Sequence, residues 1–124
     1  MIQANELRIG NYISYDKIEK LPTIVEGIYF DEEYERQSII CRHVEDFINE
    51  FEPIPLTEEW LLKFGFVKFI ELQVYQLQGF EIAFEKGFFW YMLDTRGEIQ
   101  VTYLHDLQNL YFAITKTELT IDIN

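Results

Sequence analysis

The sequence has little of three residue types that catalytic and metal-binding sites commonly use. Of its 124 residues, one is cysteine, two are histidine and six are glycine. A lone cysteine excludes a disulfide within this sequence, which is typical of proteins from a reducing compartment. Neither His43 nor His105 has a second histidine three or four residues away, so we expect neither a metal ion nor a cofactor. The glycines fall at turns and strand bends, and none is left for a phosphate-binding loop.

Basic residues and long apolar runs are scarce as well. The sequence has 10 Lys and Arg against 22 Asp and Glu, a formal net charge of -12. Nucleic acid and anionic membranes repel such a chain, so we expect it to bind neither directly. No apolar run approaches the length of a membrane span, and the N-terminus lacks the basic and apolar regions of a signal peptide. These absences indicate a cytoplasmic protein.

Apolar and aromatic residues, in contrast, are abundant, at 48% and 17% of the chain. They suffice for a packed core. The sequence is organised around residues 53–66, which predict a short helix. Thr57 is suited to cap its N-terminus, and Glu58 and Glu59 place negative charge at the positive end of the helix dipole. Gly65 is suited to the left-handed conformation that ends a helix.

The N-terminal part, residues 1–52, predicts a small, strongly curved and SH3-like β-sheet. Its strand candidates are short and rich in β-branched and aromatic residues, and Gly27 within one of them predicts a bulge. Asp31–Glu35 predicts an acidic hairpin tip. Residues 44–51 have apolar residues at helical spacing and fit either a single turn or an irregular connection. The predicted strands are 12–15, 23–30 and 38–42, with a loop at 16–21.

Residues 67–124 predict an antiparallel β-meander packed by a C-terminal helix. Residues 88–93 are apolar on both faces, which predicts a central strand covered on both sides. Residues 103–114 repeat apolar side chains at helical spacing, with His105 and Gln108 away from the apolar stripe. Other strand candidates are 67–70, 74–77, 80–85 and 98–102, with turns at 78–79, 86–87 and 94–97 and a tail at 117–124 that alternates like a strand.

The expected fold class is therefore α+β: a small curved N-terminal β-sheet, a central short helix and an antiparallel β-meander packed by a C-terminal helix. We expect one domain, 1–124, with these parts at 1–52, 53–66 and 67–124.

Two patterns were weighed as chemical sites. Cys41 and His43 lie two residues apart on a predicted strand and could form a thiol–imidazole pair, but a core cysteine beside an exposed histidine is the favoured interpretation. The aromatic run 88–91, with Tyr75 and Tyr103, fits core packing best, with a stacking platform or a protein interface as alternatives. The protein is therefore not expected to be an enzyme.

The acidic residues give the one functional hypothesis with a mechanism. They crowd the predicted hairpin tip and the approach to the central helix. If folding brings them together, they form a negative surface that is attracted to a basic nucleic-acid channel and released by salt. The alternative is a solvated acidic face that only maintains solubility. The candidate partner-binding residues are Asp31, Glu32, Glu33, Glu35, Glu45, Asp46, Glu50, Glu52, Glu58 and Glu59.

Three stretches in collinear order, residues 5–12, 53–66 and 105–113, also suggest a relationship to known proteins. They read NELRIGNY, PIPLTEEWLLKFGF and HDLQNLYFA. The sequence resembles a family of small phage and mobile-element proteins of Bacteroidota. Members of that family often have a glycine after the last helix, and Lys116 stands at that place here. The resemblance carries over no catalytic residues, and it implies an accessory protein in a bacterial cytoplasm.

Charge and resemblance together lead to two main hypotheses. The first is a non-enzymatic acidic protein that binds and inhibits a basic nucleic-acid-handling host protein, in the manner of an anti-CRISPR inhibitor of an RNA-guided nuclease. The second is a structural or scaffolding module of a phage or mobile element, which predicts oligomers that are insensitive to salt. An enzyme, the third possibility, would depend on Cys41 or His43.

Overall fold

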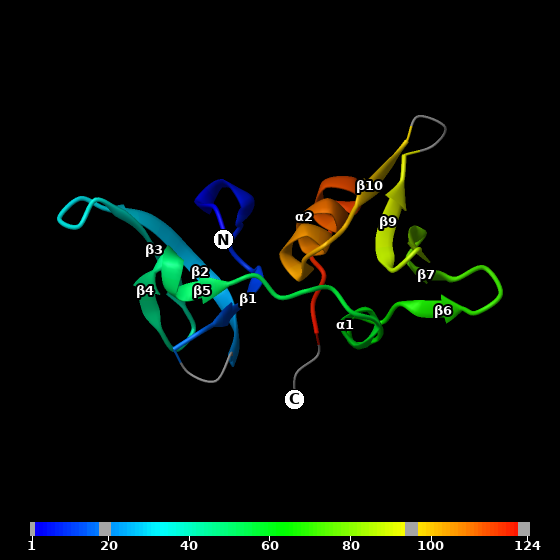
Figure 1. The fold of residues 1–124 in the computed structure, drawn as a ribbon, viewed down its shortest axis with the longest axis horizontal. Coiled ribbons are helices and arrows are strands. Elements are labelled where there is room, and N and C mark those ends of the chain that lie inside the picture. Colours follow the sequence, from blue (N-terminus) through cyan, green and yellow to red (C-terminus); the bar gives the residue numbers. More distant parts are fainter. Residues whose placement is uncertain (1, 18–20, 94–96, 122–124) are drawn as a thin grey trace. The chain divides into compact units, whose positions relative to one another are not determined.

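The computed structural model describes residues 2–17, 21–93 and 97–121. The chain divides into two compact units, Met1–Ile54 and Pro55–Asn124. Each unit holds one five-stranded antiparallel sheet, as Figure 1 shows. The second unit also carries both α-helices. The α+β class, the N-terminal sheet, the central helix and the meander packed by the last helix are confirmed. The single-domain organisation stays a prediction.

The sheet of the first unit has the strand order β4-β3-β2-β1-β5. The three strands predicted there are confirmed, and the register shift between Val25 and Gly27 is the predicted bulge. The predicted loop at 16–21 lies partly outside the described residues, and Leu21 already begins β2. The elements are η1 (Ala4–Glu6), β1 (Tyr12–Tyr15), β2 (Leu21–Asp31), β3 (Arg36–Cys41), β4 (Glu45–Phe47), η2 (Ile48–Glu50) and β5 (Phe51–Glu52).

The helical spacing over residues 44–51 yields only the 3-10 turn η2 between two short strands. Phe51 explains the outcome. It is 1% exposed and packs on Tyr15, with 5.0 Å between the ring centroids. Phe51 pairs with Tyr15 across β5 and β1. Its backbone is therefore extended and cannot continue a helix from η2. The buried core around it consists of Ile2, Leu7, Ile13, Tyr15, Val25, Ile39, Cys41 and Phe51.

The sheet of the second unit has the order β10-β9-β8-β7-β6, a meander in which every strand pairs with its sequence neighbour. The predicted turn at 94–97 lies largely outside the described residues. Residues 117–121 form no strand, although Leu119 is buried. The elements are α1 (Glu58–Lys63), β6 (Val67–Phe69), β7 (Val74–Leu77), β8 (Phe80–Glu85), β9 (Phe88–Met92), β10 (Glu98–Gln100) and α2 (Leu104–Thr115).

Helix α1 begins and ends as its sequence predicts. The side-chain hydroxyl of Thr57 accepts a hydrogen bond from the Trp60 amide at 3.4 Å. At the other end Gly65 has φ of 98°, and the Phe66 amide donates to the carbonyl of Leu61 at 3.0 Å. This pair of features is a Schellman motif, which satisfies carbonyls that the helix leaves without partners.

Helix α2 packs on one face of the second sheet. The ring of Tyr111 lies 5.1 Å from that of Phe80, centroid to centroid, in an edge-to-face contact. The expectation that His105 and Gln108 lie away from the buried side is wrong, since they are 1% and 0% exposed. Ile114, predicted to be part of the apolar stripe, is 50% exposed. The buried arc of α2 is therefore wider at its N-terminal end than hydrophobicity alone indicates.

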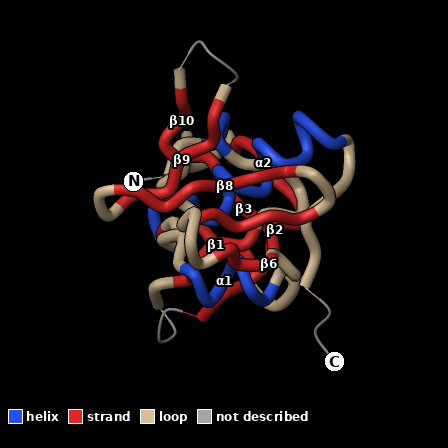
Figure 2. The backbone as a smooth tube through the Cα atoms, turned by 90° about the vertical axis from the view of Figure 1, so that its right-hand side faces the viewer, coloured by secondary structure: helices blue, strands red, loops and turns tan. Residues whose placement is uncertain are grey.

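The other face of the second sheet is exposed at several of its described residues. Residues 88–93 are predicted to form a central strand covered on both sides. Strand β9 is internal, between β8 and β10, but the prediction that both of its faces are covered is wrong. Phe88 and Met92 are 52% and 53% exposed. The described part of this unit has two α-helices, and α2 packs on the opposite face, that of Phe80; Figure 2 colours helices blue and strands red. None of the helices in the described part of the chain is long and apolar enough to cross a membrane.

Candidate functional site

An acidic depression lies on the first sheet, where β2, β3 and β4 run side by side. Ser38 of β3 pairs in register with Tyr29 of β2 and with Phe47 of β4. Directly paired residues of antiparallel strands share a face, so their side chains meet on one side of the sheet. The depression has a volume of about 220 Å³ and is lined by Tyr29, Asp31, Ser38, Glu45, Asp46 and Phe47. Strand pairing thus brings Asp31 and Glu45, from two separate stretches of sequence, to the same side of the sheet. Asp46 also lines the depression, but it follows Glu45 directly in β4, so its side chain points to the other side of the sheet.

Two tyrosine hydroxyls hold carboxylates of this depression in place. Tyr15 donates to Oδ2 of Asp46 at 2.6 Å, and Tyr29 donates to Oε2 of Glu45 at 2.6 Å. Oδ1 of Asp46 also accepts from the amide of Phe47 at 2.8 Å. Hydrogen bonds to an ionised acceptor are shorter and stronger than those between neutral groups. They fix the orientation of both carboxylates.

Asp46 is the most strongly held of these acids. Its partial burial works against ionisation, but hydrogen bonds from Tyr15 and Phe47 and the charge of Lys17 outweigh burial, so the pKa of Asp46 is lowered. Lys17 lies 3.2 Å from Asp46 and 3.9 Å from Glu50. The same hydrogen bond, together with burial and the charges of Asp46 and Glu50, raises the pKa of Tyr15 to about 12. Asp46 is therefore ionised and Tyr15 protonated at neutral pH.

The turn between β2 and β3 continues the negative charge. Oδ1 of Asp31 accepts from the amides of Glu33 and Tyr34 at 3.0 and 3.3 Å, which fixes the start of the turn. The ring of Tyr34 then packs on Phe47, with centroids 5.4 Å apart. The remaining acids of the turn are exposed. We call the combined surface the acidic face; it consists of Asp31, Glu32, Glu33, Glu35, Glu45 and Asp46.

The structure places the other four candidate acids elsewhere. Glu50 reaches the acidic face only through Lys17, and Glu52 is exposed on β5. Glu58 and Glu59 belong to the second unit, where each pairs with a lysine: Glu58 with Lys68 at 3.0 Å and Glu59 with Lys63 at 3.2 Å. Six of the ten candidates thus belong to one continuous part of the first unit.

An apolar surface is the second feature that a partner could recognise. Residue pairing across the second sheet puts Phe69, Val74, Ala83 and Trp90 in one row on its uncovered side. None of them is buried. Alternation in β6 was the available sequence signal, since Val67 and Phe69 flank Lys68. We call this surface the open face; its apolar residues are Val67, Phe69, Val74, Ala83, Phe88, Trp90 and Met92, and its acids are Glu81, Glu85 and Glu98.

Cys41 and His43 do not share a strand. Strand β3 ends at Cys41, which is buried, while His43 is exposed in the following bend. Burial raises the pKa of the Cys41 thiol to about 11, only partly offset by a hydrogen bond with Thr23. A thiol with such a pKa is a poor nucleophile at neutral pH. Among the described residues, no group of three or more His, Cys, Asp or Glu side chains is placed to hold a metal ion.

Comparisons of the chain with protein-family models, with curated proteins and with solved structures give no match.

Proposed function

We propose that the protein is a non-enzymatic, acidic accessory protein of the phage type that binds a basic surface of a nucleic-acid-handling host protein in the bacterial cytoplasm. The observation that carries the proposal is the acidic face, where Asp31, Glu45 and Asp46 line one depression and an exposed acidic turn extends it. Hydrogen bonds already hold the carboxylates of all three residues. A pre-oriented negative surface loses less entropy on binding and attracts a basic partner from a distance.

The resemblance to phage and mobile-element proteins of Bacteroidota supports a narrower form of this proposal. In that form the partner is an RNA-guided nuclease, and the protein acts as an anti-CRISPR-like inhibitor. The channel that holds guide RNA and target is positively charged in such nucleases. The acidic face then occupies part of this channel and competes with RNA.

The test uses a set of charge changes with a matched control. The test variant carries Glu32→Gln, Glu33→Gln and Glu45→Gln, which remove three exposed charges from the acidic face. The control carries Glu81→Gln, Glu85→Gln and Glu98→Gln, which remove three exposed charges from the second unit. Both variants change the net charge equally. Asp31 and Asp46 stay intact because they accept backbone hydrogen bonds.

Binding of each protein to a purified RNA-guided nuclease, with and without guide RNA, is measured at low and high salt. We expect the wild type and the control to bind the guide-free nuclease at low salt, with weaker binding at high salt and with bound guide. We expect the test variant to bind at least about tenfold more weakly, since each lost charge contact contributes a fraction of the binding energy. Equal binding by the test variant and the control contradicts a role for the acidic face.

The open face favours a second candidate function, a structural module that pairs with a second copy of itself. Four of its apolar side chains, Val67, Phe69, Phe88 and Met92, are between 43% and 59% exposed. Exposed apolar patches of this kind mark association surfaces. Glu81, Glu85 and Glu98 of two copies would repel each other, so salt should not weaken this pairing. Sedimentation of the wild type and of Phe69→Ser at low and high salt distinguishes the two functions.

A further inference from the structure

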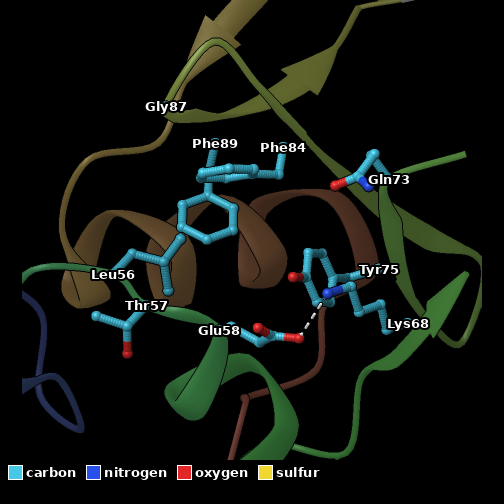
Figure 3. Close-up of a pocket in the computed structure, with 9 residues that line it drawn as sticks. All are labelled: Leu56, Thr57, Glu58, Lys68, Gln73, Tyr75, Phe84, Gly87 and Phe89. Atoms are coloured by element: carbon cyan, nitrogen blue, oxygen red, sulfur yellow. Dashed lines mark ion pairs between the residues drawn. The ribbon is translucent and has the colours of Figure 1, made fainter. Parts of the chain in front are cut away.

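A pocket in the second unit lies between the start of α1 and the covered side of the second sheet. Its volume is about 370 Å³, within the range of about 300–1,000 Å³ that small-molecule sites occupy. Figure 3 shows the side chains around it. None of them belongs to the acidic face or to the open face. They are Leu56, Thr57, Glu58, Lys68, Gln73, Tyr75, Phe84, Gly87 and Phe89.

One side of this pocket is apolar. The rings of Phe84 and Phe89 lie 4.9 Å apart, centroid to centroid, and Leu56 lies nearby in Figure 3. Phe80 and Ile82 share a face of β8 with Phe84, and they are 2% and 0% exposed. Phe84 is 36% exposed where it borders the pocket. The pocket therefore offers one partly exposed aromatic ring, backed by the buried ring of Phe89.

The opposite side carries a pair of opposite charges. Glu58 Oε1 and Lys68 Nζ lie 3.0 Å apart, and the side chains are 45% and 32% exposed. Tyr75 hydrogen bonds with both, and it is 3% exposed. The hydrogen bond to Glu58 raises the pKa of Lys68, so Lys68 is charged at neutral pH. In Figure 3 the Glu58 carboxylate faces the two phenylalanine rings across the pocket.

We propose that this pocket binds a free α-amino acid with an apolar or aromatic side chain. The ammonium and carboxylate of an α-amino acid are attached to one carbon, so they are about as close together as the charges of Glu58 and Lys68. Aligned head to tail, the ligand's ammonium contacts Glu58 and its carboxylate contacts Lys68. Its side chain then lies against Phe84 and Phe89.

Charge balance selects this class of ligand over simpler ions. An anion would meet Glu58 as well as Lys68, and a cation would meet Lys68 as well as Glu58, so a singly charged ligand must break the existing pair. A zwitterion keeps both pocket charges paired and adds two contacts. Because leucine and phenylalanine make apolar contact with the rings and glycine does not, they should bind more tightly than glycine.

The ligand test uses L-phenylalanine and L-leucine with three controls, and isothermal titration calorimetry as the readout. N-acetyl-phenylalanine lacks the ammonium charge, phenylalanine amide lacks the carboxylate, and glycine lacks the side chain. We expect both apolar amino acids to bind, and each control to bind at least about tenfold more weakly, a difference of about 1.4 kcal/mol. Absence of binding by both amino acids, or equal binding by the charge-blocked derivatives, overturns the proposal.

Variants of the full chain locate the site. Glu58→Gln and Lys68→Met break the pocket pair, and Phe84→Ala removes the exposed ring. The matched controls are Glu59→Gln and Lys63→Met, from an ion pair 3.2 Å long on the outside of α1, and Phe88→Ala on the open face. We expect at least a tenfold loss of affinity only in the pocket variants. Circular dichroism verifies folding, and Glu58→Asp provides a second variant that keeps the charge but shortens its reach.

An equal loss of affinity in the control variants places the binding elsewhere and contradicts the assignment. The test involves no nuclease and no residue of the acidic face, so it succeeds or fails independently of the proposed function.

Discussion

The Tyr15 hydroxyl and the Asp46 carboxylate, 31 positions apart in sequence, form a hydrogen bond of 2.6 Å at the edge of the first unit's core. Tyr15 is 7% exposed and its ring packs on Phe51. This bond connects the core to the acidic face. Together with the ion pair to Lys17, it holds the Asp46 carboxylate in a fixed position.

Replacing Tyr15 with phenylalanine should destabilise the first unit by about 1–3 kcal/mol, because the ring stays while a hydrogen bond to a charged acceptor is lost. Tyr29→Phe is the matched control. It removes an equally short bond to Glu45 from a residue that is 38% exposed, and it should cost less stability than Tyr15→Phe because water can replace the lost bond. The measurement is chemical denaturation followed by circular dichroism, since both tryptophans lie in the second unit. Equal losses of unfolding free energy in the two variants would mean that the buried hydrogen bond of Tyr15 stabilises the unit no more than the exposed one of Tyr29.

Acid should weaken the first unit through Asp46. The folded-state pKa of Asp46 is lowered, so its contribution to stability is present above the unfolded pKa of about 3.9 and is lost as pH falls through the folded value. We expect the difference in unfolding free energy between wild type and Asp46→Asn to be constant near neutral pH and to shrink below about pH 4. A difference that grows as the pH falls would mean that the folded-state pKa of Asp46 is raised and not lowered.

Alkali should weaken the same contact through Tyr15. The pKa of Tyr15 is raised to about 12, so its contribution to stability is complete below the unfolded pKa of about 10 and is lost as pH rises through 12. The pKa values of Tyr29 and Tyr75 are raised as well, so tyrosinate absorbance is expected to show several late-titrating phenols in the wild type and one fewer in Tyr15→Phe. If the variant loses an early-titrating phenol instead, Tyr15 is not held by Asp46 in solution.

Local features of the fold were predictable from sequence, and long-range ones were not. Helix α1 follows from Thr57 and Gly65, because caps act over three or four residues. The bulge at Gly27 and strand β1 follow from equally local signals. In contrast, the burial of His105 and Gln108 depends on what packs against α2, which periodicity does not specify. Hydrophobicity assigned these two residues to the wrong side for that reason.

The candidate surfaces, too, were only partly predictable from the sequence. Composition identified the acids, but only strand pairing brings Asp31, Glu45 and Asp46 to one depression. Residues 88–93 are apolar on both faces, which resembles a buried strand, yet the unit has helices enough to cover only one face. The amino-acid pocket had no sequence signal at all. Glu58 was fully explained by the helix dipole, and its partner Lys68 lies on another element.

Gly65 should resist substitution because of its backbone. An added Cβ would lie 3.7 Å from Cδ1 of Leu77, which is ordinary contact, so space is not the obstacle. The φ of 98° is the obstacle, since a side chain there costs about 1–2 kcal/mol. We expect Gly65→Ala to lower the free energy of unfolding by that amount. Gly65→Asn should cost less, because asparagine tolerates left-handed conformations. Equal costs would point to crowding by Leu77 instead.

Lys116 offers the converse case, a position where glycine should improve stability. It ends α2 in the left-handed conformation, with φ of 62°, while its amide donates to the carbonyl of Phe112 at 2.8 Å. The Cβ atom of lysine is sterically unfavourable in this conformation, and glycine has no Cβ. Lys116→Gly should therefore stabilise the second unit by about 1 kcal/mol. Lys116→Ala is the matched control, because it removes the same charge but keeps the Cβ. Thermal unfolding should rank glycine above both alanine and lysine. If glycine and alanine behave alike, the gain comes from charge, and α2 does not end through a strained left-handed residue.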